Sequence, residues 1–164
     1  MKKSCLIAVA VLMVCMIPSL ASAQGAVKKG PEIMREPDME KDSLHNLDVA
    51  RQYFKLKKAY VAALQRCEEV LAANPDFSKI DEVLFIAGQS SLYLASSKGK
   101  QQATQYVIHD GDKKTTLSSD EFKEKARGYL NQLVVEHPQS SFRGQAEESL
   151  KSMGEPKQKT TSGL

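Results

Sequence analysis

Charge of one sign is not in excess in this sequence. The 164 residues include 23 Lys and Arg against 20 Asp and Glu, which gives a formal net charge of +3. Proteins that bind nucleic acid or strongly anionic membranes through their overall charge usually carry a marked basic excess. The near-neutral balance therefore gives no electrostatic reason to expect a nucleic-acid partner.

Apolar runs long enough to cross a bilayer are also lacking. The N-terminal run Cys5–Ile17 covers 13 residues, whereas a transmembrane helix needs about 20. Lys2-Lys3 precedes this run and Ala21-Ser22-Ala23 follows it, which is the layout of a secretory signal peptide. We therefore expect residues 1–23 to be removed during export, with cleavage before Gln24.

The same segment allows a second interpretation. Leu12 stands three residues before Cys15, as in a bacterial lipoprotein signal, in which a lipid on the cysteine anchors the protein. Met13 and Val14 are larger than the residues usual between them. Release as a soluble protein and tethering through Cys15 both stay open, and membrane association is expected only in the second case.

Cysteine is scarce as well. After residue 23 the chain retains only Cys67, which excludes an intramolecular disulfide in the exported form. Cys67 stands among apolar residues of a predicted helix, and no basic residue is placed to activate its thiol. We expect it to be a small buried hydrophobic residue.

Catalytic and metal-binding patterns are missing. The sequence has no glycine-rich phosphate loop and no nucleophile elbow. His45, His109 and His137 are not paired with Cys67 at metal-ligand spacing. Asp110-Gly111-Asp112 lacks the closing acidic residue of a calcium loop and is expected to form a turn. We therefore expect no enzyme, no cofactor, no metal and no small-molecule substrate.

Helical periodicity is what the sequence does contain. Apolar residues recur at three- and four-residue steps in several segments, which predict helices over about residues 44–56, 59–73, from 78 onward, 119–136 and 141–153. Ser78 is expected to cap the third of these, and Ser118 with Glu121 to form a capping box at the fourth. Residues 24–43 and 154–164 are polar and aperiodic, and are expected to form a flexible leader and a disordered tail.

One spacing occurs twice in these helices. Ala63, Cys67 and Pro75 form the first set, and the second set is Ala126, Leu130 and Pro138. With the apolar residues that precede each set, the pattern resembles the tetratricopeptide repeat. The resemblance implies an all-α fold of antiparallel helix hairpins, about two and a half repeats long, over residues 44–153. An unrelated helical bundle is the alternative, since apolar faces of this period occur in any packed helix.

The second repeat contains an insertion at about residues 97–118. Phe54 precedes Ala63 by nine residues, whereas Ser91 precedes Ala126 by 35, so 26 residues are added. Residues 103–108 and 115–117 are β-prone and Asp110-Gly111 favours a turn between them. We expect a β-hairpin that projects from the helices.

The signal-like start, the repeats and two short phrases, Ala-Ala-Asn-Pro-Asp and Glu-His-Pro-Gln-Ser-Ser-Phe, are similar to one bacterial group. It is the D-subunit family of the outer-membrane β-barrel assembly machinery and its periplasmic relatives. The resemblance implies a non-catalytic periplasmic adaptor, with outer-membrane association possible in that family, whose partner is another protein of the cell envelope. The alternative function is a structural envelope protein that self-associates through the insertion.

Repeats of this kind use the first helix of each pair to line a concave groove. The outward faces of those helices therefore supply the candidate partner-binding residues. Phe85 and Leu92 are two helical turns apart on one stripe and are expected to anchor a peptide or helix; packing beneath the insertion is equally compatible with the pattern. The full candidate set is His45, Asp48, Gln52, Lys55, Glu82, Phe85, Gln89 and Leu92.

Overall fold

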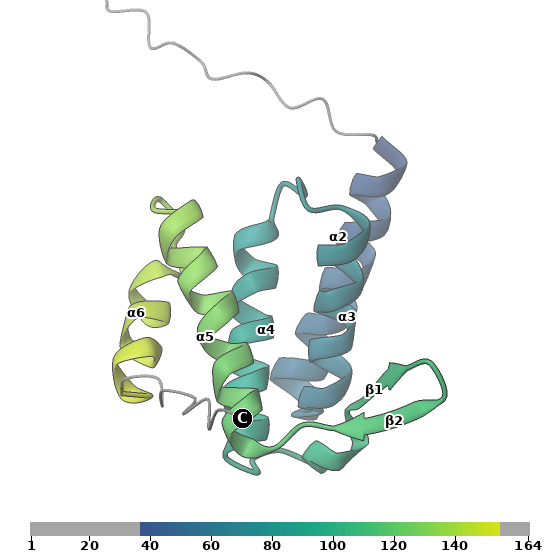
Figure 1. The fold of residues 1–164 in the computed structure, drawn as a ribbon. Coiled ribbons are helices and arrows are strands. Elements are labelled where there is room, and N and C mark those ends of the chain that lie inside the picture. The colour runs from purple at the N-terminus through teal and green to yellow at the C-terminus, as the bar shows by residue number, and fades with distance from the viewer. Residues whose placement is uncertain (1–36, 155–164) are drawn as a thin grey trace, which may run out of the picture. The chain divides into compact units, whose positions relative to one another are not determined.

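The computed structural model describes residues 37–154, which are mostly helical. Five helices pack in sequence, with a small antiparallel β-hairpin between α4 and α5 (Figure 1). The helices are α2 (Pro37–Arg51), α3 (Tyr60–Ala73), α4 (Ile80–Ala95), α5 (Ser119–Glu136) and α6 (Arg143–Ser152). Shorter elements are the π-helical segment η1 (Gln52–Lys57), the 3-10 turn η2 (Ala103–Gln105), and the strands β1 (Val107–Asp110) and β2 (Lys113–Thr116).

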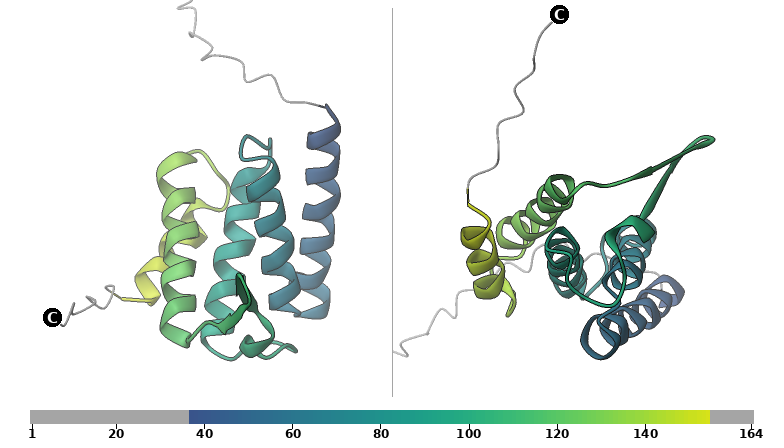
Figure 2. Two further views of the ribbon diagram at one scale, coloured as in Figure 1. Left: turned by 45° about the vertical axis from the view of Figure 1, so that its right-hand side comes forward. Right: turned by 90° about the horizontal axis from the view of Figure 1, so that it is seen from below.

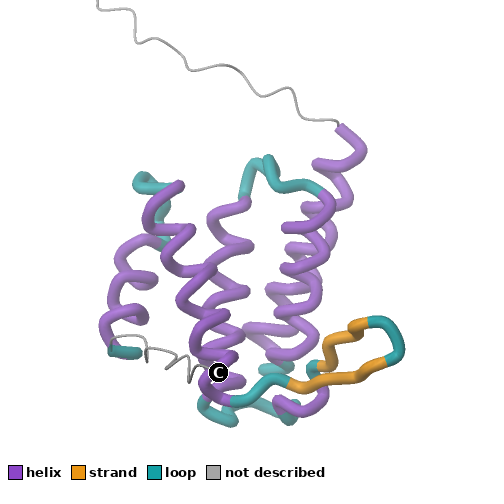
Figure 3. The backbone as a smooth tube through the Cα atoms, in the orientation of Figure 1, coloured by secondary structure: helices purple, strands orange, loops and turns teal. Residues whose placement is uncertain are grey.

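Successive helices lie side by side and alternate in direction, as the tube in Figure 3 shows. The helix α4 is central, because it packs against α3 on one side and α5 on the other, and α6 packs against α5. The hairpin projects from the end of the bundle at which α4 finishes and α5 begins (Figure 2). The expected arrangement of antiparallel helices with an inserted hairpin is thus present in the described part of the chain.

The first helix begins at Pro37 and not at Leu44, so residues 37–43 are helical and are not part of a flexible leader. Proline is favoured in the first helical turn, and the acidic residues that follow it complement the helix dipole. The segment 37–43 also packs against the α3–α4 connection, where the Asn74 amide donates to the Ser43 hydroxyl at 3.2 Å. Sequence periodicity missed the extension because few of its residues are apolar.

The remaining N- and C-terminal predictions fall on residues outside the described range. The signal peptide at 1–23, the Cys15 anchor and leader residues 24–36 precede it, and tail residues 155–164 follow it. They stay predictions.

The end of α2 differs from a regular helix. The predicted helix over 44–56 continues after Arg51 as the wider η1 turn, and Lys58 then adopts a left-handed conformation with a φ of 50°. The Lys58 N–H donates to the Tyr53 carbonyl, which closes the last turn. A π-turn at a helix end rotates the side chains that follow it relative to the rest of the helix.

Other helix ends follow the sequence signals with one exception. The C-cap residues of α3 and α5 are Asn74 and His137, each immediately before a proline. Ser118 and Glu121 form the predicted capping box at α5. The prediction that Ser78 caps α4 is wrong, because the cap position is Lys79 and no side chain caps this helix.

The insertion forms the expected hairpin with shifted boundaries. Residues 103–105 are a 3-10 turn and not strand, so β1 starts only at Val107. It pairs with β2 from Val107 opposite Thr116 to Asp110 opposite Lys113. Gly111 has a φ of 57°, which glycine adopts without steric cost and which closes the tight turn.

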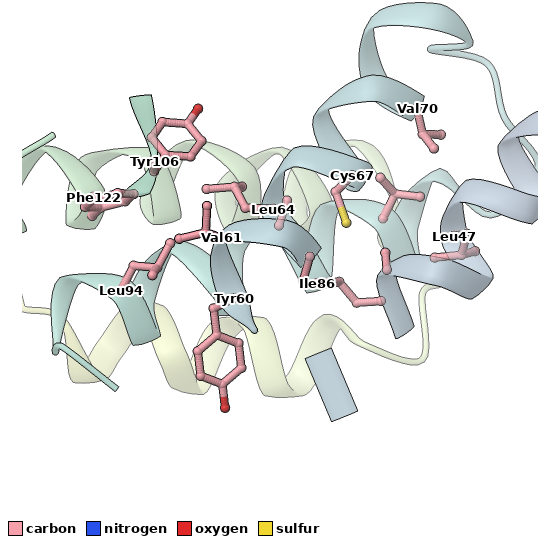
Figure 4. Close-up of a cluster of buried hydrophobic side chains, with 14 of the residues drawn as sticks. Leu47, Tyr60, Val61, Leu64, Cys67, Val70, Ile86, Leu94, Tyr106 and Phe122 are labelled. Carbon is pink, nitrogen blue, oxygen red and sulfur yellow. The ribbon is translucent and has the colours of Figure 1, made fainter. Parts of the chain in front are cut away.

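Two hydrophobic clusters hold the helices together. The larger joins α2, α3 and α4 with Tyr106 of the insertion and Phe122 of α5, and Figure 4 shows ten of its side chains by name. The smaller lies between α4, α5 and α6 and contains Leu84, Leu130, Leu133 and Ala146. Cys67 is 1% exposed in the larger cluster, and burial raises the pKa of its thiol. The predicted buried cysteine is confirmed.

Small side chains mark the closest helix approaches. Ala63 and Ala126, the residues at equivalent positions of the repeated spacing, are both fully buried. A Cβ atom at Gly88 of α4 would lie 2.6 Å from Cγ of Leu130 on α5. Gly88, which is unfavourable inside a helix, therefore marks a close helix approach.

Candidate functional site

The candidate residues on the first helix lie on an open surface. His45 and Asp48 of α2 and Gln52 and Lys55 of η1 are all exposed. Their exposure agrees with the outward face assigned to them from periodicity. They can contact a partner without any rearrangement of the core.

The candidate residues on α4 are not freely exposed, and this corrects the sequence interpretation. Gln89 is only 8% exposed, and Glu82, Phe85 and Leu92 are partly buried. Helix α6 covers two of them: the Gln89 amide donates to the Ser149 hydroxyl at 2.6 Å, and the Phe85 ring stacks on Phe142 with centroids 4.9 Å apart. The cover of Phe85 and Gln89 is thus the last helix with its N-cap residue Phe142, and not the insertion.

An ion-pair network that the sequence did not indicate joins α2 to α4. Arg51 donates through Nε to Glu82 at 2.7 Å and through a terminal nitrogen at 2.5 Å, a two-point contact. Its other terminal nitrogen lies 2.5 Å from the Asp48 carboxylate. The hydrogen bond to Glu82 is the main cause of the raised pKa of Arg51. Glu82 is therefore occupied within the protein and fixes the spacing of the two helices.

A groove lies where η1, α4 and α6 meet. Its cavity volume is about 230 Å³, below the roughly 300–1,000 Å³ usual for small-molecule sites. The lining from η1 and α4 is aromatic and amide, and the lining from α6 is polar and acidic: Phe54, Phe85, Gln89 and Tyr93 face Gln145, Glu148 and Ser149. The groove brings together two of the eight candidate residues, Phe85 and Gln89.

Two of the rings that line this groove, Phe54 and Tyr93, pack against each other and against Tyr60. The Tyr60 and Tyr93 centroids are 4.7 Å apart, and Phe54 lies 5.6 Å from Tyr60 and 5.9 Å from Tyr93. Burial raises the pKa of Tyr60. Rings packed on one another lose little conformational entropy when a ligand binds, so this wall is preorganised. Helical periodicity did not single out Tyr93 or the α6 residues as groove residues, because the position of α6 depends on packing.

A second polar cluster lies away from the groove, where the insertion meets α3 and α5. The Glu68 carboxylate accepts hydrogen bonds from the Tyr106 and Tyr129 hydroxyls, each at 2.9 Å, and pairs with Lys125 at 2.7 Å. The Lys125 ammonium also lies 5.5 Å from the centre of each tyrosine ring. Every polar group in this cluster has a partner, so we interpret it as the attachment of the insertion to the helices.

The pKa values of Tyr106, Lys125 and Tyr129 in this cluster are raised. Burial raises the pKa of Tyr129 and of Tyr106. Burial alone would lower the pKa of Lys125, but the hydrogen bond to Glu68 and the charge of Glu68 outweigh it and raise that pKa. All three groups therefore hold their protons more tightly in the folded state than in the unfolded chain.

This direction of shift predicts an alkaline loss of stability. A group whose pKa is raised on folding stabilises the protein below its unfolded pKa, which is about 10 for tyrosine and lysine, and loses that contribution as the pH rises further. The free energy of unfolding should therefore fall above about pH 10, and Tyr129→Phe should make the fall shallower. Denaturant titrations at a series of pH values measure both slopes.

Tyr53→Phe is the matched control, since the Tyr53 hydroxyl makes no hydrogen bond within residues 37–154. A Tyr129→Phe profile that coincides with that of Tyr53→Phe would mean that the Glu68 cluster contributes nothing to the pH dependence.

No group of three or more His, Cys, Asp or Glu side chains within residues 37–154 is placed to hold a metal ion. Among the helices of the described region, none combines the length and the apolar character needed to cross a membrane. Known protein families, curated protein sequences and solved structures were all compared with this chain, and none of the three comparisons finds a match.

Proposed function

We propose that this protein is a non-catalytic, periplasmic protein-binding adaptor built from tetratricopeptide-like helix hairpins. The alternating directions of consecutive helices and the buried Ala63 and Ala126 at repeated positions support this reading of the fold. In that arrangement α2, α4 and α6 are the first helices of successive pairs. The periplasmic setting and a role in outer-membrane protein assembly rest on the signal-like N-terminus and the family resemblance.

The observation that supports binding most directly is the groove between η1, α4 and α6. It lies on the side that the first helices of such repeats use for ligands, and its walls combine aromatic rings with free polar groups. The aromatic rings offer an apolar surface to one side chain of a partner, and Gln145 and Glu148 offer hydrogen-bonding groups beside it. The partner we propose is a peptide segment with an apolar anchor flanked by polar or basic residues.

A photo-crosslinking experiment tests this proposal. The photoreactive residue benzoylphenylalanine replaces Gln145, which lines the groove and is exposed, in the full chain expressed in its bacterial compartment. We expect a discrete crosslinked envelope protein, identified by mass spectrometry, and loss of that product when Glu148→Arg is added. Both positions are on the groove edge, so the fold should remain intact by circular dichroism.

The matched control carries the same photoreactive residue at Gln65, which is exposed on α3 and does not line the groove. Equal crosslinking from Gln65 and Gln145 would contradict a specific groove. A product made of two copies of this chain would favour the alternative of self-association, for which the exposed strand β2 is the available observation.

A further inference from the structure

Five lysines gather at the end of the bundle from which the hairpin projects, the lower end in Figure 1. They come from two segments distant in sequence, the end of η1 and the loop after α4. All five are exposed: Lys55, Lys57, Lys58, Lys98 and Lys100, which together we call the basic end.

Specific contacts hold the two segments together. The Lys100 N–H donates to the Lys58 carbonyl at 2.9 Å. Between them, Gly99 has a φ of 99°, and a Cβ atom there would lie 2.5 Å from the Tyr60 ring and 2.7 Å from the Lys58 carbonyl. Only glycine fits that conformation and that space. The basic end is therefore a defined surface and not two independent loops.

Two of the lysines are also positioned by aromatic rings. The Lys57 ammonium lies 4.7 Å above the Tyr53 ring, and the Lys98 ammonium lies 5.8 Å from the centre of the Tyr93 ring. Cation–π contacts of this kind orient the lysine but leave its positive charge uncompensated. These ammonium groups stay available to an external anion.

The charge of the basic end is not neutralised within the described residues. Among the side chains that the structure describes in residues 37–154, none forms a salt bridge with any of the five lysines. The nearby N-terminus of α5 supplies two carboxylates, but Asp120 pairs with Lys123 at 3.6 Å and Glu121 bonds to Ser118 in the capping box. A chain that is near neutral as a whole thus has a locally basic surface.

An exposed leucine lies within this surface. Leu56 is 76% exposed, and Lys55, Lys57 and Lys58 are its neighbours in the chain. A single exposed leucine is ordinary by itself. An apolar side chain among unpaired lysines is the composition of segments that bind a membrane surface, where lysines meet phosphate groups and the apolar side chain enters the headgroup layer.

We propose that the basic end docks onto an anionic phospholipid surface through its five lysines and Leu56, whether or not Cys15 carries a lipid. All five cations are lysines, which suit a diffuse array of headgroups, whereas arginine predominates where a planar anion is bound at two points. The acidic side chains Asp81 and Glu136 lie at the opposite end, in the cleft between the two proline turns, which orients that end away from the membrane. The surface shares no residue with the groove proposed for the protein partner and adjoins it where Lys98 contacts the Tyr93 ring.

Sedimentation with lipid vesicles tests the proposal. The protein is expressed with its own leader, in a Cys15→Ser background that prevents lipidation, and the mature N-terminus is determined by mass spectrometry. We expect it to bind vesicles of phosphatidylglycerol and phosphatidylcholine but not vesicles of phosphatidylcholine alone. The double variant Lys98→Gln/Lys100→Gln should bind about 25-fold more weakly, at about fivefold for each lysine removed.

The charge-matched control is Lys41→Gln/Lys79→Gln, whose lysines are exposed and lie in the first half of α2 and at the start of α4, away from the basic end. Its vesicle affinity should change by less than about twofold, because charges more than about 10 Å from the contact are screened at moderate salt. Equal losses in the two double variants would mean that net charge alone drives binding and would overturn the proposal.

The variant Leu56→Ser distinguishes binding to a lipid surface from binding to an acidic protein. It keeps every charge, so it should weaken vesicle binding by about tenfold, through lost apolar burial, and leave binding to soluble polyglutamate unchanged. Vesicle affinity that is unaffected by Leu56→Ser, together with tight polyglutamate binding, would identify an acidic protein partner and overturn the lipid assignment. Circular dichroism melts confirm that each exposed-site variant is folded.

Discussion

Replacing Phe122 by alanine is expected to lower the free energy of unfolding by about 3–5 kcal/mol, the usual cost of emptying a fully buried phenylalanine site. Phe122 is 0% exposed, lies in the first turn and a half of α5 and contacts Tyr106 edge-on with ring centroids 5.5 Å apart. The truncation therefore leaves a cavity between the helices and the insertion. Urea unfolding followed by circular dichroism measures the change.

The control for this change is Val135→Ala on the same helix. Val135 is 75% exposed, so its truncation should alter stability by no more than about 0.5 kcal/mol. If Phe122→Ala proves as mild as Val135→Ala, the insertion does not pack on α5 as described. Hydrogen exchange at residues 107–116 would then show no difference between the two variants.

Gly88→Val is expected to cost about 1–3 kcal/mol of stability, because the interior at this helix crossing has no room for a side chain. The new Cβ atom would lie 2.6 Å from Cγ and 2.7 Å from Cδ2 of Leu130. Gly128 of α5 is the matched control, since a Cβ atom there meets no atom within 4 Å. Gly128→Val removes the same helix-destabilising glycine without the clash and should be neutral or stabilising.

A compensating change makes the crossing testable in a second way. Leu130→Ala alone should destabilise by about 2–5 kcal/mol, since it empties a fully buried site. In the double variant Gly88→Val/Leu130→Ala the valine occupies part of that space. The combined loss should therefore be smaller than the sum of the single losses by about 1–3 kcal/mol. Strict additivity would mean that the two residues do not touch.

The fold could be predicted further from the sequence than the binding surface could. Helix ends with strong local signals, such as the capping box at Ser118 and the prolines after Asn74 and His137, occur where the pattern placed them. Element boundaries that depend on contacts with distant residues do not occur where the pattern placed them. The early start of α2 depends on packing against the α3–α4 connection, and the 3-10 turn at residues 103–105 replaces a segment whose composition favoured strand.

In the candidate site too, features set by local sequence could be predicted, and features set by distant packing could not. Exposure of His45, Asp48, Gln52 and Lys55 followed from helical periodicity, since one helix and its apolar stripe determine which side faces outward. The covering of Gln89 by α6 could not be predicted, because Ser149 lies 60 residues further along the chain. Nothing in the local sequence of α4 indicates which helix will pack there.

The sequence by itself determined the number and order of the five helices and the place of the hairpin between α4 and α5, because helix periodicity, proline stops and turn residues act over a few neighbouring positions. It also determined that the overall charge is near balance. Tertiary structure alone decided which residues meet: it placed α6 beside the aromatic wall of the groove, and it joined Lys58 to Lys100 so that scattered lysines became one surface. Composition averages charge over the whole chain, whereas a partner or a membrane responds to charge within about 10 Å of the contact.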